Sequence, residues 1–365
     1  MIKKALIIIW NEIWLFVFKS PVYHPRFWED ERMNREFTKN IGIVQRYATL
    51  LSGFNSDKYL LYDFSRNDKK QYLNDIRRRI LSERISKRHY YLVHNKIVFN
   101  KYFEGKCNLI PKLAMISKGR VQPLQSVSLN SASSLIEMLD KKETLFLKPF
   151  DGGSGRGIYM VEGSDDKGGY LINKDKADLN KVEKLIASLN GYVVEKKFDQ
   201  IGFAHKFYPT TLNTLRIYTM IDPETDEAFV AVALHRIGTN RSKTVDNWSK
   251  GGLSVWINPE SGLMSKGIQY PFDGEVIKHS SHPDTNVQLE GEVVPGWDLV
   301  RETILGCANY VYFLPLLGWD VVLSDGKVYI LEANYNPDVN LIQVHKPLLA
   351  DERIARFYKH HKVIR

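Results

Sequence analysis

Residues 318–334 have the sequence GWDVVLSDGKVYILEAN. An apolar run lies on each side of the dipeptide Asp325-Gly326, which is typical of a tight turn between antiparallel strands. The pattern therefore predicts a β-hairpin. Each predicted strand carries one carboxylate, Asp320 in the first and Glu332 in the second.

The length of the turn determines whether these two carboxylates share a face of the hairpin. A two-residue loop would pair Asp320 with Leu331 and place Glu332 on the opposite face. A three-residue loop ending in a left-handed Gly326 would pair Asp320 with Ile330, and Glu332 would then be a diagonal neighbour on the same face. The predicted metal site needs the three-residue loop, because only that loop brings both carboxylates close enough to hold one ion.

Asn334 follows Glu332 by two residues and continues on the same face of a strand. Two carboxylates and an amide oxygen suit Mg²⁺, with phosphate oxygens filling the remaining positions. The predicted metal ligands are therefore Asp320, Glu332 and Asn334. The alternative, a surface hairpin with no site, is disfavoured by the apolar residues around both acids.

A glycine-rich loop, DGGSGRG at 151–157, follows a predicted strand at 144–150. Its four glycines allow the backbone to approach an anion closely. The loop is neither a Walker A motif nor a dinucleotide fingerprint, because it lacks Gly-Lys-Ser/Thr and precedes another predicted strand. With Lys148 at the end of the first strand, it suits a lid over nucleotide phosphates. An ordinary flexible hairpin tip is the alternative.

The predicted strand at 212–221 carries Arg216, whose planar fork matches the geometry of a phosphate. Arg236, on the predicted returning strand at 228–237, is a second candidate. A structural salt bridge is the competing interpretation for either arginine. The neighbouring His235 is predicted to be an interior or rim histidine, not a general base.

The composition is that of a folded protein, with 365 residues, 44% hydrophobic, 25% charged and only two cysteines. It excludes disordered chains and disulfide scaffolds, and the cysteine count fits a reducing cytoplasm. Residues 1 to about 120 are predicted to be mainly helical. The rest mixes short strands with helices such as 181–189, which favours an α+β fold.

Charge and hydropathy are uneven along the chain. The net charge is +9, and residues 66–96 alone contribute +7, from ten Lys/Arg and three Asp/Glu. This basic stretch suits a phosphate-rich partner, an anionic glycan or a membrane surface, with a solvated helix face as the alternative. No nucleic-acid motif accompanies it. Residues 1–18 are too short and too polar at Glu12 to span a membrane, which leaves a packed helix or an interfacial anchor.

Taken together, these features resemble the ATP-grasp superfamily, in particular the sugar-transfer branch found with polysaccharide genes. The segments that carry the resemblance are FLKP at 146–149 with its glycine loop, VVEKKF at 193–198, LNTLR at 212–216, NWSKGG at 247–252, and GWD at 318–320 through EAN at 332–334.

The resemblance implies an ATP-grasp fold, in which two α+β lobes grip ATP. We expect four regions: a mainly helical 1–120, a small lobe at 121–205 with the lid and hinge, a large lobe at 206–348 with the Mg²⁺ site, and a basic C-terminal tail at 349–365.

The resemblance also implies roles for individual residues. It places ATP against Lys148, Gly152, Gly153, Ser154, Gly155, Gly157, Glu195, Lys196, Phe198, Gln200 and Arg216, with Glu195 near adenine and Gln200 near the ribose. It assigns catalysis to Lys148, Arg216 and Asn213, and magnesium to Asp320, Glu332 and Asn334. It gives the acceptor side to Arg236, Asn247, Lys250 and Gly251.

The implied activity is an ATP-dependent carboxylate–amine ligase that forms an amide through an acyl phosphate. By analogy with the branch, the acid is a uronic acid or glycan-linked carboxylate, and an amino acid or small amine attacks it during surface (capsule) polysaccharide biosynthesis. The expected location is the cytoplasm, with peripheral membrane contact through 1–18 and 66–96. The alternatives are a kinase of the same fold that phosphorylates a sugar hydroxyl, and a nucleotide-binding scaffold without turnover.

Overall fold

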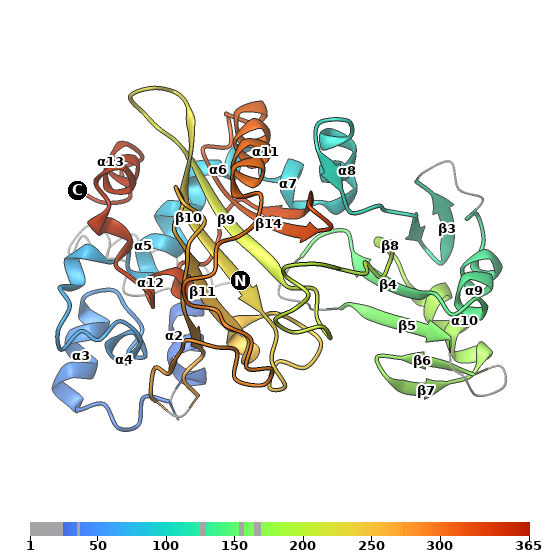
Figure 1. The fold of residues 1–365 in the computed structure, drawn as a ribbon, viewed down its shortest axis with the longest axis horizontal. Coiled ribbons are helices and arrows are strands. Elements are labelled where there is room, and N and C mark those ends of the chain that lie inside the picture. Colours follow the sequence, from blue (N-terminus) through green and yellow to red (C-terminus); the bar gives the residue numbers. More distant parts are fainter. Residues whose placement is uncertain (1–24, 35–36, 125–128, 153–156, 164–168, 273) are drawn as a thin grey trace, which may run out of the picture. The chain divides into compact units, whose positions relative to one another are not determined.

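A computed structural model describes residues 25–34, 37–124, 129–152, 157–163, 169–272 and 274–365 (Figure 1). The chain divides into two compact units. The first contains the described residues up to His89 together with Phe203–Trp319 and Tyr335–Arg365. The second contains Tyr90–Gly202 and Asp320–Asn334.

The first unit combines short helical pieces with part of a large sheet. Its helices are α2 (Pro25–Met33), α3 (Ile43–Leu51), α4 (Lys58–Leu61), η1 (Lys69–Gln71), α5 (Asp75–Arg77), η2 (Arg78–Ser82), α6 (Glu83–Ser86), η3 (Lys87–His89), η4 (Trp248–Lys250), α11 (Trp297–Tyr310), α12 (Asn340–Gln343), η5 (Leu348–Ala350) and α13 (Glu352–His360). Its strands are β9 (Thr214–Ile221), β10 (Ala228–Ile237), β11 (Leu253–Ile257), β12 (Met264–Gln269), β13 (Lys278–His279) and the start of β14 (Leu316–Ser324).

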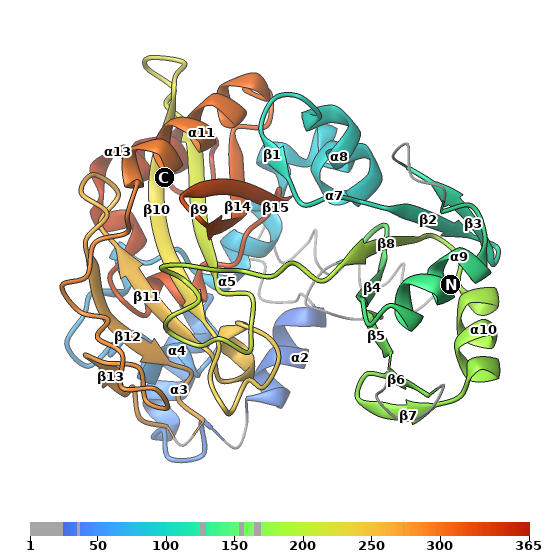
Figure 2. The same cartoon turned by 45° about the vertical axis from the view of Figure 1, so that its right-hand side comes forward.

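The second unit is built on a seven-stranded sheet of order β3-β2-β8-β4-β5-β6-β7 (Figure 2). Its strands are β1 (Asn108–Leu109), β2 (Ala114–Ser117), β3 (Arg120–Pro123), β4 (Thr144–Pro149), β5 (Tyr159–Gly163), β6 (Tyr170–Ile172), β7 (Asp175–Ala177), β8 (Tyr192–Lys196) and β15 (Lys327–Asn334). Its helices are α7 (Tyr91–His94), α8 (Lys96–Phe103), α9 (Ala132–Asp140) and α10 (Leu179–Ser188).

Helices α9 and α10 supply the apolar side chains that cover this sheet. Leu135 and Leu139 of α9, and Val182 and Ile186 of α10, are four residues apart and share a core with the strands. That spacing puts each pair on one helix face. Each helix also begins at a side-chain cap, Ser131 for α9 and Asp178 for α10. The predicted helix at 181–189 is therefore confirmed.

The larger sheet has the order β1-β15-β14-β9-β10-β11-β12-β13. Strand β14 begins in the first unit and ends in the second. The predicted hairpins β9–β10 and β14–β15 are both present, and β9 pairs with β10 in antiparallel register from Ala228↔Ile221 to Arg236↔Thr214. The observed mixture of strands and helices confirms the α+β prediction.

The turn between β14 and β15 differs from the expectation. The loop has only two residues, Asp325 and Gly326, with φ angles of +50° and +67°. Two left-handed residues in succession are typical of a type I′ turn. The three-residue loop was therefore a wrong prediction. Extended regularly from this turn, the pairing would oppose Asp320 to Leu331, so turn geometry no longer supports Asp320 on the same face as Glu332.

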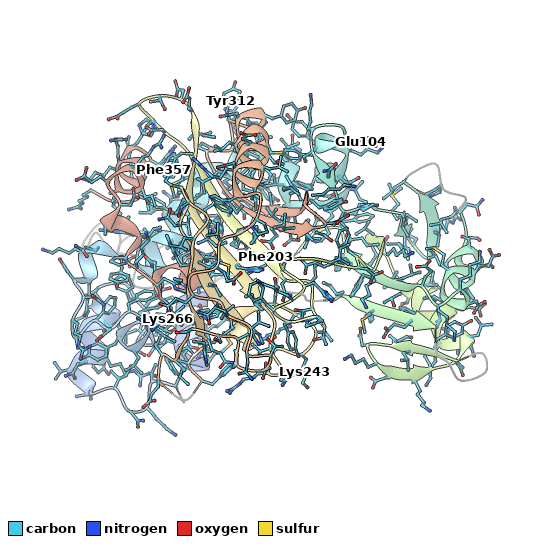
Figure 3. All side chains as sticks on the ribbon, in the orientation of Figure 1. Glu104, Phe203, Lys243, Lys266, Tyr312 and Phe357 are labelled. Atoms are coloured by element: carbon cyan, nitrogen blue, oxygen red, sulfur yellow. The ribbon has the colours of Figure 1, made fainter. Side chains whose placement is uncertain are left out.

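The region before residue 120 is less uniformly helical than expected. Strands β1 and β2 precede residue 120, and the segment from Tyr90 onward belongs to the second unit. The expected C-terminal tail instead contains α13, whose Phe357 and Tyr358 are buried in the core of the first unit (Figure 3).

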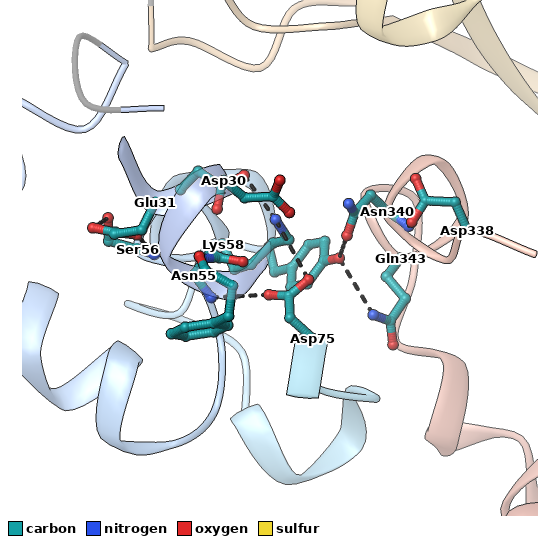
Figure 4. A network of polar contacts seen from close by, with 12 residues as sticks. Asp30, Glu31, Asn55, Ser56, Lys58, Asp75, Asp338, Asn340 and Gln343 are labelled. Carbon is teal, nitrogen blue, oxygen red and sulfur yellow. Dashed lines mark hydrogen bonds and ion pairs between the residues drawn. The ribbon is translucent and has the colours of Figure 1, made fainter. Parts of the chain in front are cut away.

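Buried polar contacts join the helical start of the first unit to its C-terminal segment (Figure 4). Gln343 accepts a hydrogen bond from the backbone N–H of Leu73 (2.7 Å), and its own Nε2 donates to the Leu73 carbonyl (3.0 Å). Tyr62 donates to Asn340 Oδ1 at 2.9 Å. Such satisfied buried groups fix how the two segments pack.

In the same region, the positive charge of the buried Lys58 compensates the charges of two carboxylates. Lys58 Nζ lies 2.7 Å from Asp57 Oδ2 and 3.8 Å from Asp75 Oδ1 (Figure 4). Burial raises the pKa of Asp75 to about 6, although Lys58 opposes the rise. These acids are therefore compensated within the protein and contribute little negative charge to its surface.

The expectations about membrane contact concern helices that could cross a bilayer and residues 1–18. No helix among the described residues combines the length and hydropathy that crossing a bilayer requires. Residues 1–18, for which a packed helix or an interfacial anchor was expected, lie outside the described residues.

Candidate functional site

Two lysines of the second unit converge on one buried carboxylate. Lys148 lies on β4 and Glu195 on β8, and the register pairs Phe146 with Glu195 and Lys148 with Val193. Lys148 and Glu195 are therefore diagonal neighbours on one face of the sheet. Glu195 Oε2 is 2.5 Å from Lys148 Nζ, and Glu195 Oε1 is 2.5 Å from Lys112 Nζ.

Burial strengthens the electrostatic attraction between Glu195 and the two lysines. Glu195 and Lys112 are each 2% exposed. Burial alone would raise the pKa of Glu195, but Lys112 and Lys148 outweigh it and lower the value to about 2. Burial lowers the pKa of Lys112, against the attraction of Glu195 and of Glu332. Two lysine side chains thus contact one ionised carboxylate, and this surplus of basic groups suits an anionic ligand.

A pocket in the second unit brings Lys112 together with part of the predicted metal site. Its lining includes Lys96, Lys112, Gly152, Glu332 and Asn334. Glu332 and Asn334 are two residues apart on β15, so the strand presents both to one side. The pocket thus combines two ammonium groups, a carboxylate, an amide and the start of the glycine loop.

The segment that joins α7 to α8 contacts the start of the glycine loop. Asn95 caps α8 by accepting from two backbone N–H groups, and its Nδ2 donates to Asp151 Oδ1 at 3.0 Å. Lys96 Nζ donates to the Gly152 carbonyl at 3.2 Å, and its backbone N–H donates to the Phe150 carbonyl at 2.9 Å. A segment far away in sequence therefore holds the described start of the loop, Asp151 and Gly152, in place.

The glycine loop is described only at its ends. Gly152 and Gly157 have φ angles of +115° and +71°, a region that side chains rarely adopt, so both ends need glycine. The predicted nucleotide contacts Gly153, Ser154 and Gly155 lie outside the described residues.

The predicted hinge residues have partners within the second unit. Lys196 is exposed and forms an ion pair with Glu143 (2.5 Å), and Phe198 packs edge-on against Tyr329. Gln200 is 4% exposed, and its Nε2 donates to the Leu323 carbonyl at 3.1 Å. The structure therefore gives Gln200 an internal contact where the resemblance implied the ribose.

Asn213 and Arg216 belong to the first unit. Asn213 is 0% exposed: its Nδ2 donates to the carbonyls of Ala204 and Tyr208, and its Oδ1 accepts from Thr211 and from the Gly238 N–H. These four bonds use its whole capacity. In this structure the side chain holds the loops around β9 in place, and the catalytic role of Asn213 stays a prediction.

Arg216 has a buried tyrosine as its neighbour on β9. Burial raises the pKa of the Tyr218 hydroxyl to about 12, and a hydrogen bond from Arg216 opposes the rise. The Tyr218 hydroxyl also donates to the Asp338 carbonyl. The guanidinium is thus oriented by a rigid partner.

The predicted acceptor-side residues also lie in the first unit. Arg236 donates to Thr214 Oγ1 (2.6 and 3.0 Å) and lies 3.5 Å from Asp246. Asn247 caps η4 through the Ser249 N–H, Lys250 is exposed, and Gly251 has a φ of +107°. The salt bridge proposed as the competing interpretation of Arg236 is therefore present. His235 is fully buried, as expected for an interior histidine.

Comparison with known sequences places this arrangement in a family. The model of the sugar-transfer-associated ATP-grasp family matches residues 76–356, about three quarters of the chain. The chain belongs to the sugar-transfer-associated ATP-grasp family. The ATP-grasp resemblance is thus confirmed, and the match begins well before residue 121, where the motif-bearing region was expected to start.

Solved ATP-grasp structures show distant similarity. N5-carboxyaminoimidazole ribonucleotide synthetase with ADP is 13% identical, with a TM-score of 0.38 over 73% of this chain and 52% of that one. D-alanyl-alanine synthetase A from Vibrio cholerae is 12% identical, with a TM-score of 0.38 over 74% and 60%. This chain spans about half the length of the first of these structures. No curated protein sequence matches it.

The segments that carry the resemblance do not include Lys112, which the sequence-based prediction missed. Lys112 stands in the run Ile110-Pro111-Lys112-Leu113-Ala114, directly before β2. A lysine in an apolar run at the start of a strand needs a buried partner, because an unpaired charge is costly there. That pattern was the available signal, but it could not identify Glu195, which is 83 residues away.

The donor set of this ATP-grasp pocket fits Mg²⁺ in part. Glu332 and Asn334 offer hard oxygen ligands, and Mg²⁺ completes its shell with water and phosphate oxygens. Within the described ranges, no group of three His, Cys, Asp or Glu could hold a metal by itself. Asp320 is 3% exposed and is not among the residues lining the pocket as described. Its role as a ligand stays a prediction.

Glu195→Gln should destabilise the protein in a pH-dependent way. The folded pKa of about 2 lies below the ordinary 4.5, so the carboxylate stabilises the fold above pH 4.5 and loses this effect as pH falls toward 2. At neutral pH we expect a loss of about 3 kcal/mol in the free energy of unfolding, shrinking toward acid pH. Urea unfolding across this pH window measures it.

Glu143→Gln is the matched control for this prediction. Glu143 pairs with Lys196 at 2.5 Å, but the two side chains are 29% and 49% exposed. Its removal should cost less than about 1 kcal/mol, because water screens exposed ion pairs. Equal losses in both variants, or a Glu195→Gln loss that does not change with pH, would contradict the buried-cluster argument.

Proposed function

We propose that this ATP-grasp chain is a carboxylate–amine ligase that uses ATP to form an amide. The observation that carries the proposal is the surplus of basic groups, Lys112 and Lys148, around one buried carboxylate, beside a pocket that also holds Glu332 and Asn334. A polyphosphate that carries a divalent cation is the ligand class that this combination best complements.

The lysines around Glu195 and the residues that line the neighbouring pocket would share the binding of the nucleotide. Lys112, Lys148 and Lys96 neutralise the phosphate oxygens, and Glu195 holds two of these lysines in fixed positions. Glu332 and Asn334, with Asp320 as the further predicted ligand, would hold Mg²⁺, which neutralises charge on the terminal phosphates when bound. The glycine loop covers the phosphates and excludes water. The assignment of Arg216, on β9 of the first unit, to the transferred phosphoryl group stays an implication of the resemblance.

The proposed reaction has two steps. An oxygen of the substrate carboxylate attacks the γ-phosphorus, the bond to the β-phosphate oxygen breaks, and ADP leaves. The amine nitrogen then attacks the acyl carbon of the acyl phosphate, inorganic phosphate leaves with the C–O electron pair, and the nitrogen loses a proton. Lysines that hold the phosphates in line supply positioning and charge stabilisation, so no side-chain nucleophile is needed.

The proposed acid is a uronic acid or another glycan-linked carboxylate, and the proposed amine is an amino acid or a small amine. The association of the family with sugar transfer supports this choice, together with a role in surface polysaccharide synthesis in the cytoplasm. The support is an analogy at the level of the family.

A hydroxylamine trap tests the reaction type. Purified protein with Mg·ATP is screened against a panel of uronic acids, with ADP release and product mass as readouts. We expect acid-dependent ADP release and a hydroxamate when hydroxylamine replaces the amine. A stable phosphomonoester without hydroxamate would show the kinase instead. ATP binding without ADP release across the panel would show a scaffold.

A further inference from the structure

Helix α3 has an apolar face that points to solvent. Ile43, Val44, Tyr47 and Leu51 are 71%, 72%, 60% and 74% exposed. At 3.6 residues per turn these positions fall on one side of the helix, and Ala48, also exposed, lies between them. A surface helix of a soluble protein normally directs this kind of face into the core.

The opposite side of α3 is already anchored. Leu50 is buried in a cluster with Phe27 of α2, and Thr49 is fully buried. Arg46 donates to Glu31 of α2 at 2.7 Å. The helix therefore cannot turn its apolar face inward without breaking these contacts. Figures 1 and 2 show α3 beside α4 within the first unit.

One basic residue contacts α3, and others stand close to it in sequence. Lys69 of η1 donates to the Ala48 carbonyl of α3 at 3.4 Å, and Lys70 beside it is exposed. Arg32 at the end of α2 and Lys39 in the turn before α3 are exposed as well. Glu31, which contacts α3 through Arg46, is buried and paired with that arginine. Among the described residues of this region, the exposed acids Glu29 and Asp68 are fewer than the exposed bases.

Some basic residues of the run at 66–96, which was predicted to suit a surface partner, form contacts inside the protein. In the basic run at 66–96, Arg78 donates to the carbonyls of Asn336 and Pro337, and Arg79 pairs with Asp30. Lys69 and Lys70, at the start of that run, are the members next to α3. At α3, these two lysines of the basic run lie beside exposed apolar side chains.

We propose that α3 is an interfacial helix that docks on a bilayer containing anionic lipids. Ile43, Val44 and Leu51 would enter the boundary between headgroups and acyl chains, Tyr47 would sit at headgroup depth, and the neighbouring lysines would meet lipid phosphates. A second copy of the chain fits less well. Five side chains of one short helix cover roughly a few hundred Å², against about 800 Å² per partner in a stable interface.

Vesicle binding by the full chain tests the proposal. Binding to phosphatidylglycerol–phosphatidylcholine vesicles is measured by sedimentation and compared with phosphatidylcholine alone. We expect binding that needs the anionic lipid and weakens with salt. The combined variant Ile43→Ser, Tyr47→Ser, Leu51→Ser should lower the partition coefficient by about tenfold or more.

Two matched controls distinguish vesicle binding through the α3 face from nonspecific binding through other exposed side chains. Leu263→Ser, Val293→Ser, Tyr312→Ser removes three apolar side chains of the same unit that are 45%, 52% and 66% exposed, and it should bind vesicles as the wild type does (Tyr312, Figure 3). Arg32→Gln, Lys69→Gln, Lys70→Gln should lose the preference for anionic lipid. Lys243→Gln, Lys266→Gln, Lys278→Gln, away from α3 in sequence, should keep it.

Without vesicles, the free energy of unfolding and the oligomeric state show whether protein, rather than lipid, covers the α3 face. If α3 faces lipid, the serine variant keeps its free energy of unfolding and its monomer or oligomer size. A large loss of stability would mean that another part of the chain covers the face, and a change in oligomeric state would mean that a second copy does. Either result overturns the proposal, as does wild-type vesicle binding by the serine variant.

Discussion

Glu332→Gln abolishes ADP formation in the expected result, with kcat reduced by about 10³-fold or more and the fold unchanged. The amide has the same shape but no charge, so the pocket loses the anionic ligand that would hold Mg²⁺ beside the phosphates. The substitution also removes the attraction that supports the charged form of Lys112. ADP release at saturating Mg²⁺ and a thermal melt give the two readouts.

Glu104→Gln is the control for this variant. Glu104 (Figure 3) is in the same unit but exposed, and it forms a surface ion pair with Lys101 at 3.1 Å. The Glu104→Gln variant should release ADP at the wild-type rate. Near-normal activity of Glu332→Gln at saturating Mg²⁺ would show that Glu332 does not hold the metal, whatever the position of the nucleotide.

Lys112→Met should lower kcat/KM for ATP by about 10²-fold, because one ammonium that faces the phosphates is lost from a buried site. It should also lower the free energy of unfolding, since Glu195 then keeps only Lys148 as a partner. ATP-dependent ADP release and urea unfolding measure the two effects. Lys101→Met, at a side chain that is 54% exposed, should change neither.

A double variant distinguishes binding from packing. Combining Lys112→Met with Glu195→Gln removes both members of the ion pair, so the stability losses should be less than additive. ATP use should not recover, because the missing ammonium cannot be replaced. Recovery of ATP use in the double variant would show that Lys112 acts only as a partner of Glu195 and not on the nucleotide.

Local pattern was enough to predict most of the elements that build the site. The strands around Lys148 and Glu332, the hairpin at Asp325-Gly326 and helix α10 follow from period-two and 3.6-residue spacing with turn and cap residues. These signals are local, because each depends on residues only a few positions apart.

The role of individual residues was harder to predict, because it depends on partners far apart in the chain. Asn213 stands in a family motif beside Arg216, but its four hydrogen bonds reach Ala204, Tyr208, Thr211 and Gly238. Motif position indicates that such a residue matters and not whether it touches a ligand. Its full burial is a property of the assembled loops.

From its amino acids alone, this chain specifies an α+β fold of the ATP-grasp type, a glycine loop after Lys148 and a strand that presents Glu332 with Asn334. Only the folded chain brings Lys112 to Glu195, shortens the turn before β15 and leaves the apolar side of α3 in solvent. The physical reason is that periodicity encodes which side of an element is apolar. What that side meets depends on long-range packing and on the energetic need to pair every buried charge.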